Sequence, residues 1–467
     1  MFGRPRSATI KPASPTPLTW QCSKITMRHI TQATCDLLIT ADFLLTQDTD
    51  RRIIEDAAVA VKGGTISALG MRSKLAHIVA QEHLHLGHSL IMPGLINAHT
   101  HVSMTFFRGL ADDLPLMQWL TEHIFPREKR LTADVVRLGA LLGCAEMIRT
   151  GTTAFQDMYL IESAVGEAVD QAGLRCRMGE AIFAFPSPAY AGLEEAFALV
   201  REQAACYKNH PRIGVAVMPH AVYTTTPEIL TACRDLAQEL NLPLHLHLAE
   251  TEAEVQTCLG AHNRRPVEYC RELGLLSPRS SIAHGVALTD AELDILALTS
   301  TTVAHNPRSN MKLASGVAPV PGMLARGMLP GLGTDGASSN NALNMFAEMS
   351  ASALLHKVHN MEATLCPAQT MLDMATLGSA AALHWSELGR LIPGAPADLI
   401  ALDLDSPNLQ PMYNPVSHLV YAASGHELRL CMVDGKILYK DGEYLSLDYP
   451  LLLAEAKKLK KWVLGKR

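Results

Sequence analysis

Between residues 93 and 335 the chain alternates short apolar runs with longer segments of helical periodicity, which limits the folds open to it. Runs such as LINAHTH at 95–101 and LPLHLHLAE at 242–250 are typical of buried strands. Between such runs lie stretches such as 132–151, where apolar residues recur every three or four positions, as in a helix. Parallel strands need long crossover connections, so this alternation predicts a parallel sheet.

Eight strand candidates occur in this region. They end at His101, Asp157, Phe183, Tyr223, Glu250, His284, Asn306 and Asp335. A (β/α)8 barrel takes about 250 residues, which matches the length of the region. An open doubly wound sheet is the alternative, but no GxGxxG sequence follows the first strand. We therefore expect an α/β fold in the form of a (β/α)8 TIM barrel.

Both ends of the chain contain short strands separated by turns, unlike the middle. Residues 36–92 and 390–445 predict a small β-sandwich domain built from both termini, flanking a barrel at 93–389. A helix is expected at 446–467. Residues 1–35 contain four prolines and no acidic residue, which predicts a disordered tail, and Met27 is a candidate start of translation.

Composition argues against several classes of partner. The formal net charge is −6 and no basic block stands out, so we expect no nucleic-acid or membrane partner. No apolar stretch is long enough to cross a bilayer. The ten cysteines include no CxxC pair, which is typical of buried free thiols in a reducing compartment. A cytoplasmic location is the expectation.

Polar residues gather at the carboxyl ends of the predicted strands. His99 and His101 are two residues apart on one strand, so both imidazoles point to the same side. Alone, such a pair fits a hydrogen-bonded core pair as well as it fits a metal site. The other strand-end candidates are His220, His247, Glu250, His284 and Asp335. In a barrel these ends converge on one catalytic face, which favours a site.

A hydrolytic metal centre needs three or four nitrogen or oxygen ligands and an open position for water. The candidate ligands are His99, His101, His247 and Asp335. His247 is preferred over His245 because it lies nearer the strand end, and His245 is expected to be buried structure. Glu250 follows His247 by three residues and is the candidate proton shuttle.

Five segments, in this order, resemble the amidohydrolase superfamily: PGLINAHTH, HLHLAET, IAHG, NPRSNMKLASG and GLGTDGASSNN. With GRLIPGAPADLIALD, which resembles the family's return to its small β-domain, the resemblance covers the chain from Asp36 to Glu443. Within the superfamily, the sequence is most similar to 5′-methylthioadenosine/S-adenosylhomocysteine deaminases and to the related triazine hydrolases.

The resemblance implies one divalent metal ion, usually zinc, at His99, His101, His247 and Asp335. It also implies that His284 and Asp335 orient the attacking water and take its proton, while Glu250 protonates the substrate ring. Superfamily members with two metals carry a carboxylated lysine at the end of the fourth strand. The corresponding segment here, VMPHAVYTT, has no lysine, so a mononuclear site is expected.

The resemblance further implies substrate contacts from Glu128, His220, Glu250 and Asp335. Glu128 lies where the deaminases accept the ribose hydroxyls, although its charged surroundings would otherwise indicate a surface acid. His220 could equally be an ordinary strand-end residue. The implied reaction is hydrolytic removal of the 6-amino group from 5′-methylthioadenosine, S-adenosylhomocysteine or a related adenosine, giving an inosine-type product and ammonia.

Two other functions stay open at this point. One is a triazine or guanine-type aminohydrolase with the same metal centre, and the other is a non-catalytic scaffold, which should lack metal ligands.

The expected partner is a small nucleoside, and we expect a homo-oligomer, a dimer or tetramer. The segment 104–120 after the first strand could cover the site or form a dimer contact, and its Trp119 is expected to be core.

Overall fold

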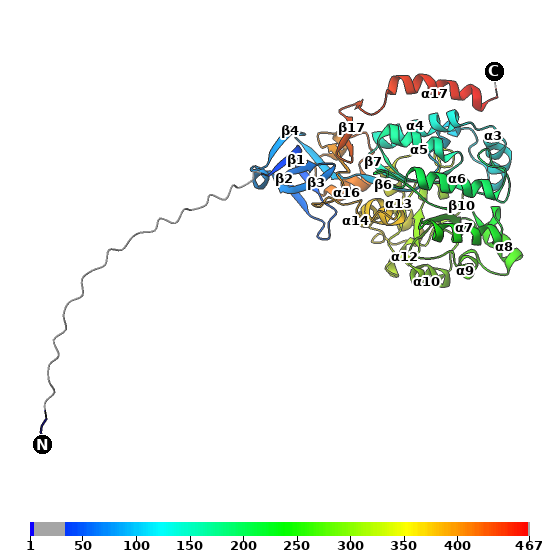
Figure 1. Ribbon diagram of the computed structural model, residues 1–467, viewed down its shortest axis with the longest axis horizontal. Helices are drawn as coiled ribbons and strands as arrows, with labels where there is room; N and C mark the ends of the chain where they lie inside the picture. The colour runs from blue at the N-terminus through cyan, green and yellow to red at the C-terminus, as the bar shows by residue number, and fades with distance from the viewer. Residues whose placement is uncertain (4–32, 466–467) are drawn as a thin grey trace.

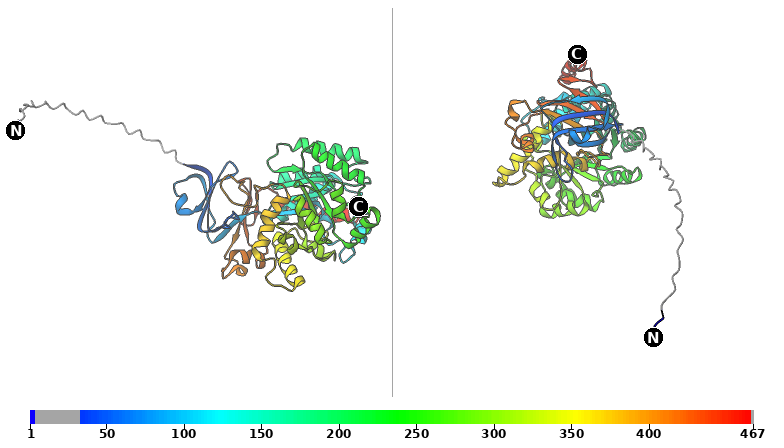
Figure 2. Two further views of the ribbon diagram at one scale, coloured as in Figure 1. Left: turned by 90° about the horizontal axis from the view of Figure 1, so that it is seen from below. Right: turned by 90° about the vertical axis from the view of Figure 1, so that its left-hand side faces the viewer.

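The structure, a computed structural model, describes residues 1–3 and 33–465. A β-sheet part and a larger α/β part lie side by side in Figure 1, and Figure 2 shows the same arrangement from two other directions. Almost all of the predicted disordered tail, residues 1–35, lies outside the described residues.

The β-sheet part draws its strands from both ends of the chain and forms one nine-stranded sheet. Its strands are β1 (Thr34–Leu45), β2 (Ile53–Lys62), β3 (Thr65–Met71), β4 (Val79–His85), β5 (Ser89–Pro93), β15 (Leu399–Asp403), β16 (Leu428–Val433), β17 (Lys436–Lys440) and β18 (Glu443–Tyr444). β5 pairs in parallel with β1 and antiparallel with β15, which joins the two halves. The sheet encloses a core of its own, to which strands from both ends contribute.

The hydrogen-bond ladder of this part is continuous, so the small β-sandwich predicted from the sequence would be formed by one connected sheet. The reason lies in β1, which is 12 residues long. Its first half pairs with β4 and its second half with β5, so the ladder branches along one strand and never breaks into two separate sheets.

The α/β part contains two parallel sheets. The first holds β6 (Leu95–Thr100), β7 (Thr152–Tyr159), β8 (Arg175–Ile182), β9 (Ile213–Val215) and β10 (Met218–Pro219). The second holds β11 (Leu244–Leu248), β12 (Ser280–His284), β13 (Thr302–His305) and β14 (Gly331–Leu332). Single bridges at Val217–Leu244 and Ala221–His247 link β10 and its flanks to β11. At the opposite edges the amide of Asp335 donates to the carbonyl of His99 at 2.9 Å, although no ladder joins β14 to β6 among the described residues.

The fourth predicted strand is the one that differs, because it is split into β9 and β10. Val217, between the two pieces, donates its amide to the carbonyl of Pro243 on the neighbouring segment. Ala216 meanwhile keeps its amide on Met178 of β8. Both pieces pair with β8, and the segment before β11 is the neighbour on the other side, so the break interrupts one strand without changing its partners. Apolar periodicity does not reveal this break.

Helices follow the strands of the α/β part and cover it (Figure 1). The longer ones are α4 (Ala133–Arg149), α5 (Glu162–Ala172), α6 (Leu193–Cys206), α7 (Pro227–Glu239), α8 (Glu252–His262), α9 (Pro266–Glu272), α10 (Asp290–Thr299), α13 (Met345–Asn360), α16 (Pro415–Tyr421) and α17 (Tyr449–Val463). Short turns of helix are α1 (Arg72–Leu75), α2 (Leu116–Gln118), α3 (Phe125–Glu128), α11 (Pro307–Lys312), α12 (Val320–Ala325), α14 (Ala368–Asp373) and α15 (Ser379–Ala382). Single 3₁₀ or π turns are η1 (Val102–Phe107), η2 (Trp119–Ile124), η3 (Val222–Thr224), η4 (Met374–Gly378) and η5 (Pro407–Leu409).

Local sequence explains where these helices begin. At α10, the Thr289 side chain accepts a hydrogen bond from the Glu292 amide, and the Glu292 carboxylate accepts one from the Thr289 amide. This reciprocal pair satisfies amides that would otherwise lack partners at the start of the helix. Across the described residues, every helix is too short or too polar to serve as a bilayer-spanning segment.

Close packing and a buried ion pair connect the two parts. β5 continues into β6 through Gly94, where a Cβ atom would lie 2.1 Å from the Thr153 hydroxyl oxygen, so only glycine fits. Arg175, at the start of β8, donates two hydrogen bonds to Asp398 at 2.6 and 3.0 Å. It also reaches Asp434 at 3.2 Å. These contacts fix the β-sheet part against the strands that carry the histidines.

Candidate metal centre

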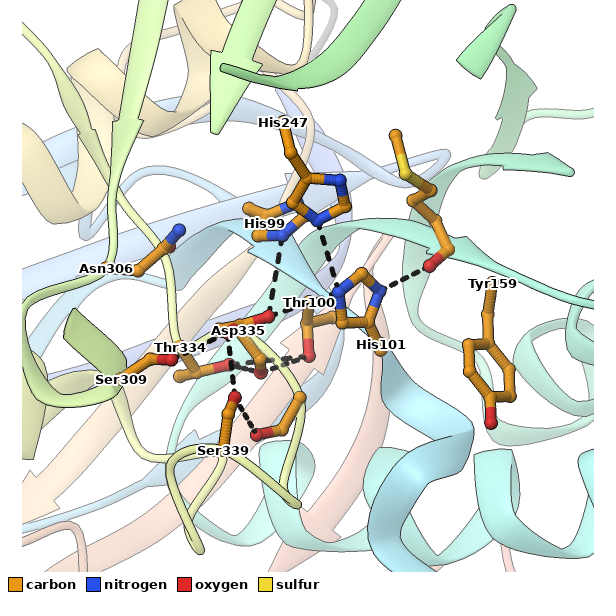
Figure 3. Close-up of polar contacts among 12 residues, drawn as sticks. His99, Thr100, His101, Tyr159, His247, Asn306, Ser309, Thr334, Asp335 and Ser339 are labelled. Atoms are coloured by element: carbon orange, nitrogen blue, oxygen red, sulfur yellow. Dashed lines mark hydrogen bonds and ion pairs between the residues drawn. The ribbon is translucent and has the colours of Figure 1, made fainter. Parts of the chain in front are cut away.

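The four predicted metal ligands lie together at the carboxyl ends of the strands (Figure 3). His99 and His101 come from the end of β6, His247 from β11, and Asp335 from the segment after β14. Oδ1 of Asp335 lies 3.1 Å from Nε2 of His101 and 3.6 Å from Nε2 of His99. The Nε2 atoms of His101 and His247 are 3.4 Å apart. Three imidazoles and one carboxylate thus face a single point.

Backbone carbonyls fix the orientation of two of these rings. Nδ1 of His101 bonds to the carbonyl of Met158, and Nδ1 of His247 bonds to the carbonyl of His220 at 2.9 Å. Because a carbonyl only accepts, each ring must carry its proton on Nδ1. When such a ring is neutral, Nε2 has a lone pair that points to the centre, which is the tautomer a metal ligand requires.

The third ring is held by a side-chain relay. Nδ1 of His99 lies 2.9 Å from Nε2 of His245, and Nδ1 of His245 lies 2.8 Å from the hydroxyl of Ser281. His245 is fully buried, as expected from the sequence, but it contacts the predicted ligand directly. In the sequence HLHL, His247 therefore lies at the centre, and His245 lies behind the predicted ligand His99.

The Asp335 carboxylate is oriented by two serine hydroxyls. Ser309 and Ser339 donate to Oδ2 at 2.6 and 2.7 Å, which leaves Oδ1 directed at the histidines. The backbone of Asp335 is left-handed, with φ of 59°. A non-glycine residue held in this region indicates strain, which is common at functional sites.

The residues present fit a bound divalent cation. Nε2 of His99 is buried and has no hydrogen-bond partner among residues 1–3 and 33–465, which is costly unless a further group binds it. Burial lowers the pKa of His99 to about 4, so this ring stays neutral. Burial also disfavours charge on His101, but the nearby Asp335 carboxylate raises the pKa of that ring to about 9. The centre therefore stabilises one positive charge next to Asp335, and three nitrogens with one carboxylate suit zinc.

His284 and Glu250 flank the four ligands. Nε2 of His284 lies 3.7 Å from a carboxylate oxygen of Glu250, and the ring centre of His284 lies 5.5 Å from that of His247. Asn310 accepts from Nδ1 of His284 at 2.9 Å when that nitrogen is protonated, which leaves Nε2 as a base directed into the site. The backbone φ of His284 is 73°, a second strained position at a strand end.

Glu250 sits on a backbone turn fixed by another glutamate. The carboxylate of Glu254 accepts from the amides of Ala249 and Glu250 at 2.9 and 2.8 Å. The Glu250 side chain is buried, with Ser315 3.4 Å from its carboxylate, and this burial raises its pKa. A carboxyl group with a raised pKa exchanges protons more readily near neutral pH.

Glu128 is buried, in contrast to the surface acid that its charged sequence surroundings would indicate. It lies in α3, and its carboxylate accepts a hydrogen bond from the Tyr159 hydroxyl at 2.8 Å. Burial raises the pKa of Glu128 to about 7. His220 follows β10, and its ring centre lies 4.7 Å from that of His247.

One cavity of about 630 Å³, counted with its open mouth, connects these groups. Its walls include His101, Glu128, His220, His247, Glu250, His284 and Asp335. Leu116, Trp119 and Leu120 line it as well, so the segment after β6 covers the cavity. Trp119 is buried, as predicted, but it faces the cavity and its Nε1 has no partner.

Sequence reasoning missed the groups that hold the site from behind. Tyr159, Ser309, Ser339 and Asn310 each bond a predicted site residue. Ser309 and Asn310 fall in the NPRSNMKLASG segment, and Ser339 falls in GLGTDGASSNN. Both segments resemble the family, but the resemblance assigns no role to these three residues. Tyr159 ends a strand two residues after Asp157 and gave no signal of its own.

The fold and the cluster define a class: α/β proteins whose parallel strands present metal ligands at their carboxyl ends, as metal-dependent hydrolases do. Residues 90–438 match the model of the Amidohydrolase family. The chain belongs to this family.

Three individual proteins of known name or structure are similar to this chain. A protein of Nitratidesulfovibrio vulgaris named 5-methylthioadenosine/S-adenosylhomocysteine deaminase is 61% identical over 92% of this chain and 98% of its own length. The crystal structure of an adenosine deaminase from Xanthomonas campestris with bound zinc matches with a TM-score of 0.90 and 35% identity, over 93% of this chain and 99% of that one. An atrazine chlorohydrolase from Arthrobacter aurescens complexed with zinc has a TM-score of 0.83 at 22% identity, over 91% and 100%, which shows the shared fold alone.

Proposed function

We propose that this protein is a hydrolytic deaminase of 5′-methylthioadenosine, S-adenosylhomocysteine or a related adenosine, releasing ammonia and an inosine-type product. The observation that carries the proposal is Glu128, whose buried carboxylate lies in the wall of the cavity that holds the candidate ligands. A triazine or guanine has no ribose for such a group to bind. The 61% identity to the deaminase of Nitratidesulfovibrio vulgaris supports the same substrate class.

The proposed cofactor is one zinc ion, held by His99, His101, His247 and Asp335. When bound, the metal supplies Lewis acidity that makes water nucleophilic at neutral pH. Zinc in the Xanthomonas campestris structure supports this choice of metal. A non-catalytic scaffold would have no need for four ligand side chains held in one orientation.

The protein's own groups then move the protons. His284 and Asp335 orient the attacking water and accept its proton, since the free Nε2 of His284 faces the cavity. As water adds to C6 of the purine, Glu250 protonates N1, so the ring carries no full negative charge. Glu250 or Asp335 then returns a proton to the amino group, the C–N bond breaks and ammonia leaves. Glu128 accepts hydrogen bonds from the ribose hydroxyls, and His220 contacts the substrate beside His247.

Ammonia release from a panel of compounds, with chloride release also measured for the triazine, tests the proposal. The panel contains 5′-methylthioadenosine, S-adenosylhomocysteine, adenosine, guanine and a chlorinated triazine. Turnover of the adenosines is the expected result. Turnover of guanine or the triazine, with adenosines untouched, would favour the alternative aminohydrolase, and no turnover by the zinc-loaded protein would favour a scaffold.

The finer architecture belongs to the same proposal. We propose that the two parallel sheets form one eight-stranded (β/α)8 barrel, supported by the bridges at one junction and the Asp335–His99 hydrogen bond at the other. The β-sheet part is proposed to pack as a sandwich around its own core. Unpaired cysteines, nine in the described residues, support a reducing, cytoplasmic location. The homo-oligomer stays a prediction.

A further inference from the structure

A second cavity, of about 1410 Å³ when it is likewise counted with its open mouth, adjoins the catalytic cavity at Glu128. The two share Phe125, Glu128, Leu160 and Phe183 in their walls. The remaining wall comes from α3 and from the loop after β8, including Phe185, Pro186 and Pro188. We call this space the aromatic cavity. Since it opens beside the proposed ribose site, a substituent on the ribose has direct access to it.

The lining of the aromatic cavity is mainly apolar. The rings of Phe183 and Phe185 are stacked with centres 4.8 Å apart, and Phe125 packs edge-on against Phe185 at 6.4 Å. Phe183 also contacts the ring of His220 at 4.7 Å. These rings form a continuous surface from the catalytic cavity outward. Such a surface favours a thioether, because sulfur makes good contacts with aromatic rings.

Charged groups are few in this cavity. Within the described part of the chain, Glu128 is the sole acid in its lining, and its carboxylate already bonds Tyr159. Lys129 is the sole cation in the lining, and it is exposed to solvent. A homocysteinyl group brings an ammonium and a carboxylate. The ammonium could pair only with Glu128, which already bonds Tyr159. The carboxylate could pair only with Lys129, whose exposed ammonium is already well solvated and therefore gains little from the contact.

A third cavity, which shares Leu116, Tyr223 and Leu313 with the catalytic cavity, has the opposite character. Asp113, Glu254 and Lys312 line it, together with Met117. Glu128 is absent from its walls. This charged cavity would suit a zwitterion, but it does not adjoin the group proposed to bind the ribose.

On the basis of the proposed function, we propose that the aromatic cavity receives the 5′ substituent and selects the methylthio group over the homocysteinyl group. The preferred substrate is then 5′-methylthioadenosine. A site lined by apolar rings discriminates against a substituent whose charges it leaves unpaired, typically by tenfold or more.

Comparison of kcat/KM for 5′-methylthioadenosine and S-adenosylhomocysteine tests this directly in the zinc-loaded protein. We expect a ratio of at least about 10 in favour of the methylthio compound. Phe185→Arg places a cation in the aromatic cavity, and 44% exposure of Phe185 leaves room for the longer side chain. This variant should lower the ratio at least about tenfold, by gaining the homocysteinyl carboxylate as a partner. Phe185→Leu keeps an apolar lining and should keep the preference.

Met117→Arg is the matched control, because Met117 is 52% exposed and lines the charged cavity. It should leave the ratio unchanged. If the parent treats both substrates alike, or if Met117→Arg shifts the ratio and Phe185→Arg does not, the aromatic cavity is not the 5′ site, while deamination stands. If no adenosine derivative releases ammonia, the proposed function fails and this inference fails with it.

Discussion

Nε2 of His245 lies 2.9 Å from Nδ1 of His99, so a second buried histidine stands directly behind a predicted metal ligand. The two rings come from β11 and β6 of different sheets. Ser281 completes the chain at 2.8 Å from Nδ1 of His245. The orientation of His99 therefore depends on a contact between the two parallel sheets.

Replacing His245 by leucine should weaken metal binding without touching a ligand. Partners that orient a ligating histidine are typically worth about 10- to 100-fold in metal affinity. Competition with a chelator measures the loss. His245→Gln offers an amide at the same place and should restore part of the affinity. Equal affinity of the parent and the leucine variant would contradict the role of the relay.

Purified protein should contain close to one equivalent of zinc per chain. Two overlapping groups of ligand atoms, His99–His247–His284 and His99–His101–Asp335, share His99, whose Nε2 has no hydrogen-bond partner among the described residues. Such overlapping groups fit a single ion. Elemental analysis measures the content. Removal of the metal should also lower the Tm, since a ligand that binds only the folded state stabilises it. Two equivalents, or full activity with none, would contradict a mononuclear centre.

Glu250→Gln should keep the metal and lose turnover. The amide preserves the shape of the side chain but cannot carry the proton to N1, and such roles are worth about 10²- to 10⁴-fold in rate. Glu252→Gln is the control, because Glu252 is an exposed acid two residues away. Steady-state kinetics with metal analysis distinguishes the variants. A kcat for Glu250→Gln within threefold of the parent would remove Glu250 from the mechanism.

Binding of the ribose should weaken as the pH falls through 7. The raised pKa of Glu128, about 7, means that the carboxylate protonates below that pH and loses its capacity to accept both ribose hydroxyls. The inhibition constant of the inosine-type product should therefore rise from pH 8 to pH 6. Glu128→Gln should remove most of this dependence, and hypoxanthine, which lacks the ribose, should show little of it in the parent. The same pH profile in parent and variant would contradict the assignment.

Arg175→Met should destabilise the protein far more than a typical arginine substitution. It leaves the Asp398 carboxylate buried without its partner, a change that costs about 3–5 kcal/mol. Arg201→Met breaks an exposed pair with Glu239 and should cost about 0–1 kcal/mol. Thermal unfolding compares the two. The double variant Arg175→Met with Asp398→Leu should recover stability, and equal Tm values for the single variants would contradict the buried-pair argument.

The ends of the strands could be predicted from the sequence because two local signals coincide there. Buried parallel strands appear as apolar runs, and the polar residues that end them mark the carboxyl edge. His99 and His101 also share a strand face by simple alternation, as the structure shows. The strand ends and the shared face of the two histidines could be predicted because both depend only on residues that are close in the sequence.

Other features depend on packing between distant segments and leave no local trace. The Tyr159–Glu128 contact requires α3 to lie against the end of β7, and this packing buries an acid that appears to be a surface residue in the sequence. The division of the fourth strand into β9 and β10, which both pair with β8, is likewise absent from the apolar pattern. The left-handed φ of His284 and Asp335 is equally hidden, because neither position is a glycine.

The pairing of β5 with β15 has a consequence for biosynthesis. β5 is fully buried, yet its partner strand lies roughly 300 residues further along the chain. At about 5–20 residues per second, a ribosome needs about 15–60 s to make the intervening segment. For that time the nascent chain carries an unpaired apolar strand edge, a ready template for pairing with other chains. The cellular yield of this protein should therefore depend on chaperones that bind the growing chain before residue 399 emerges.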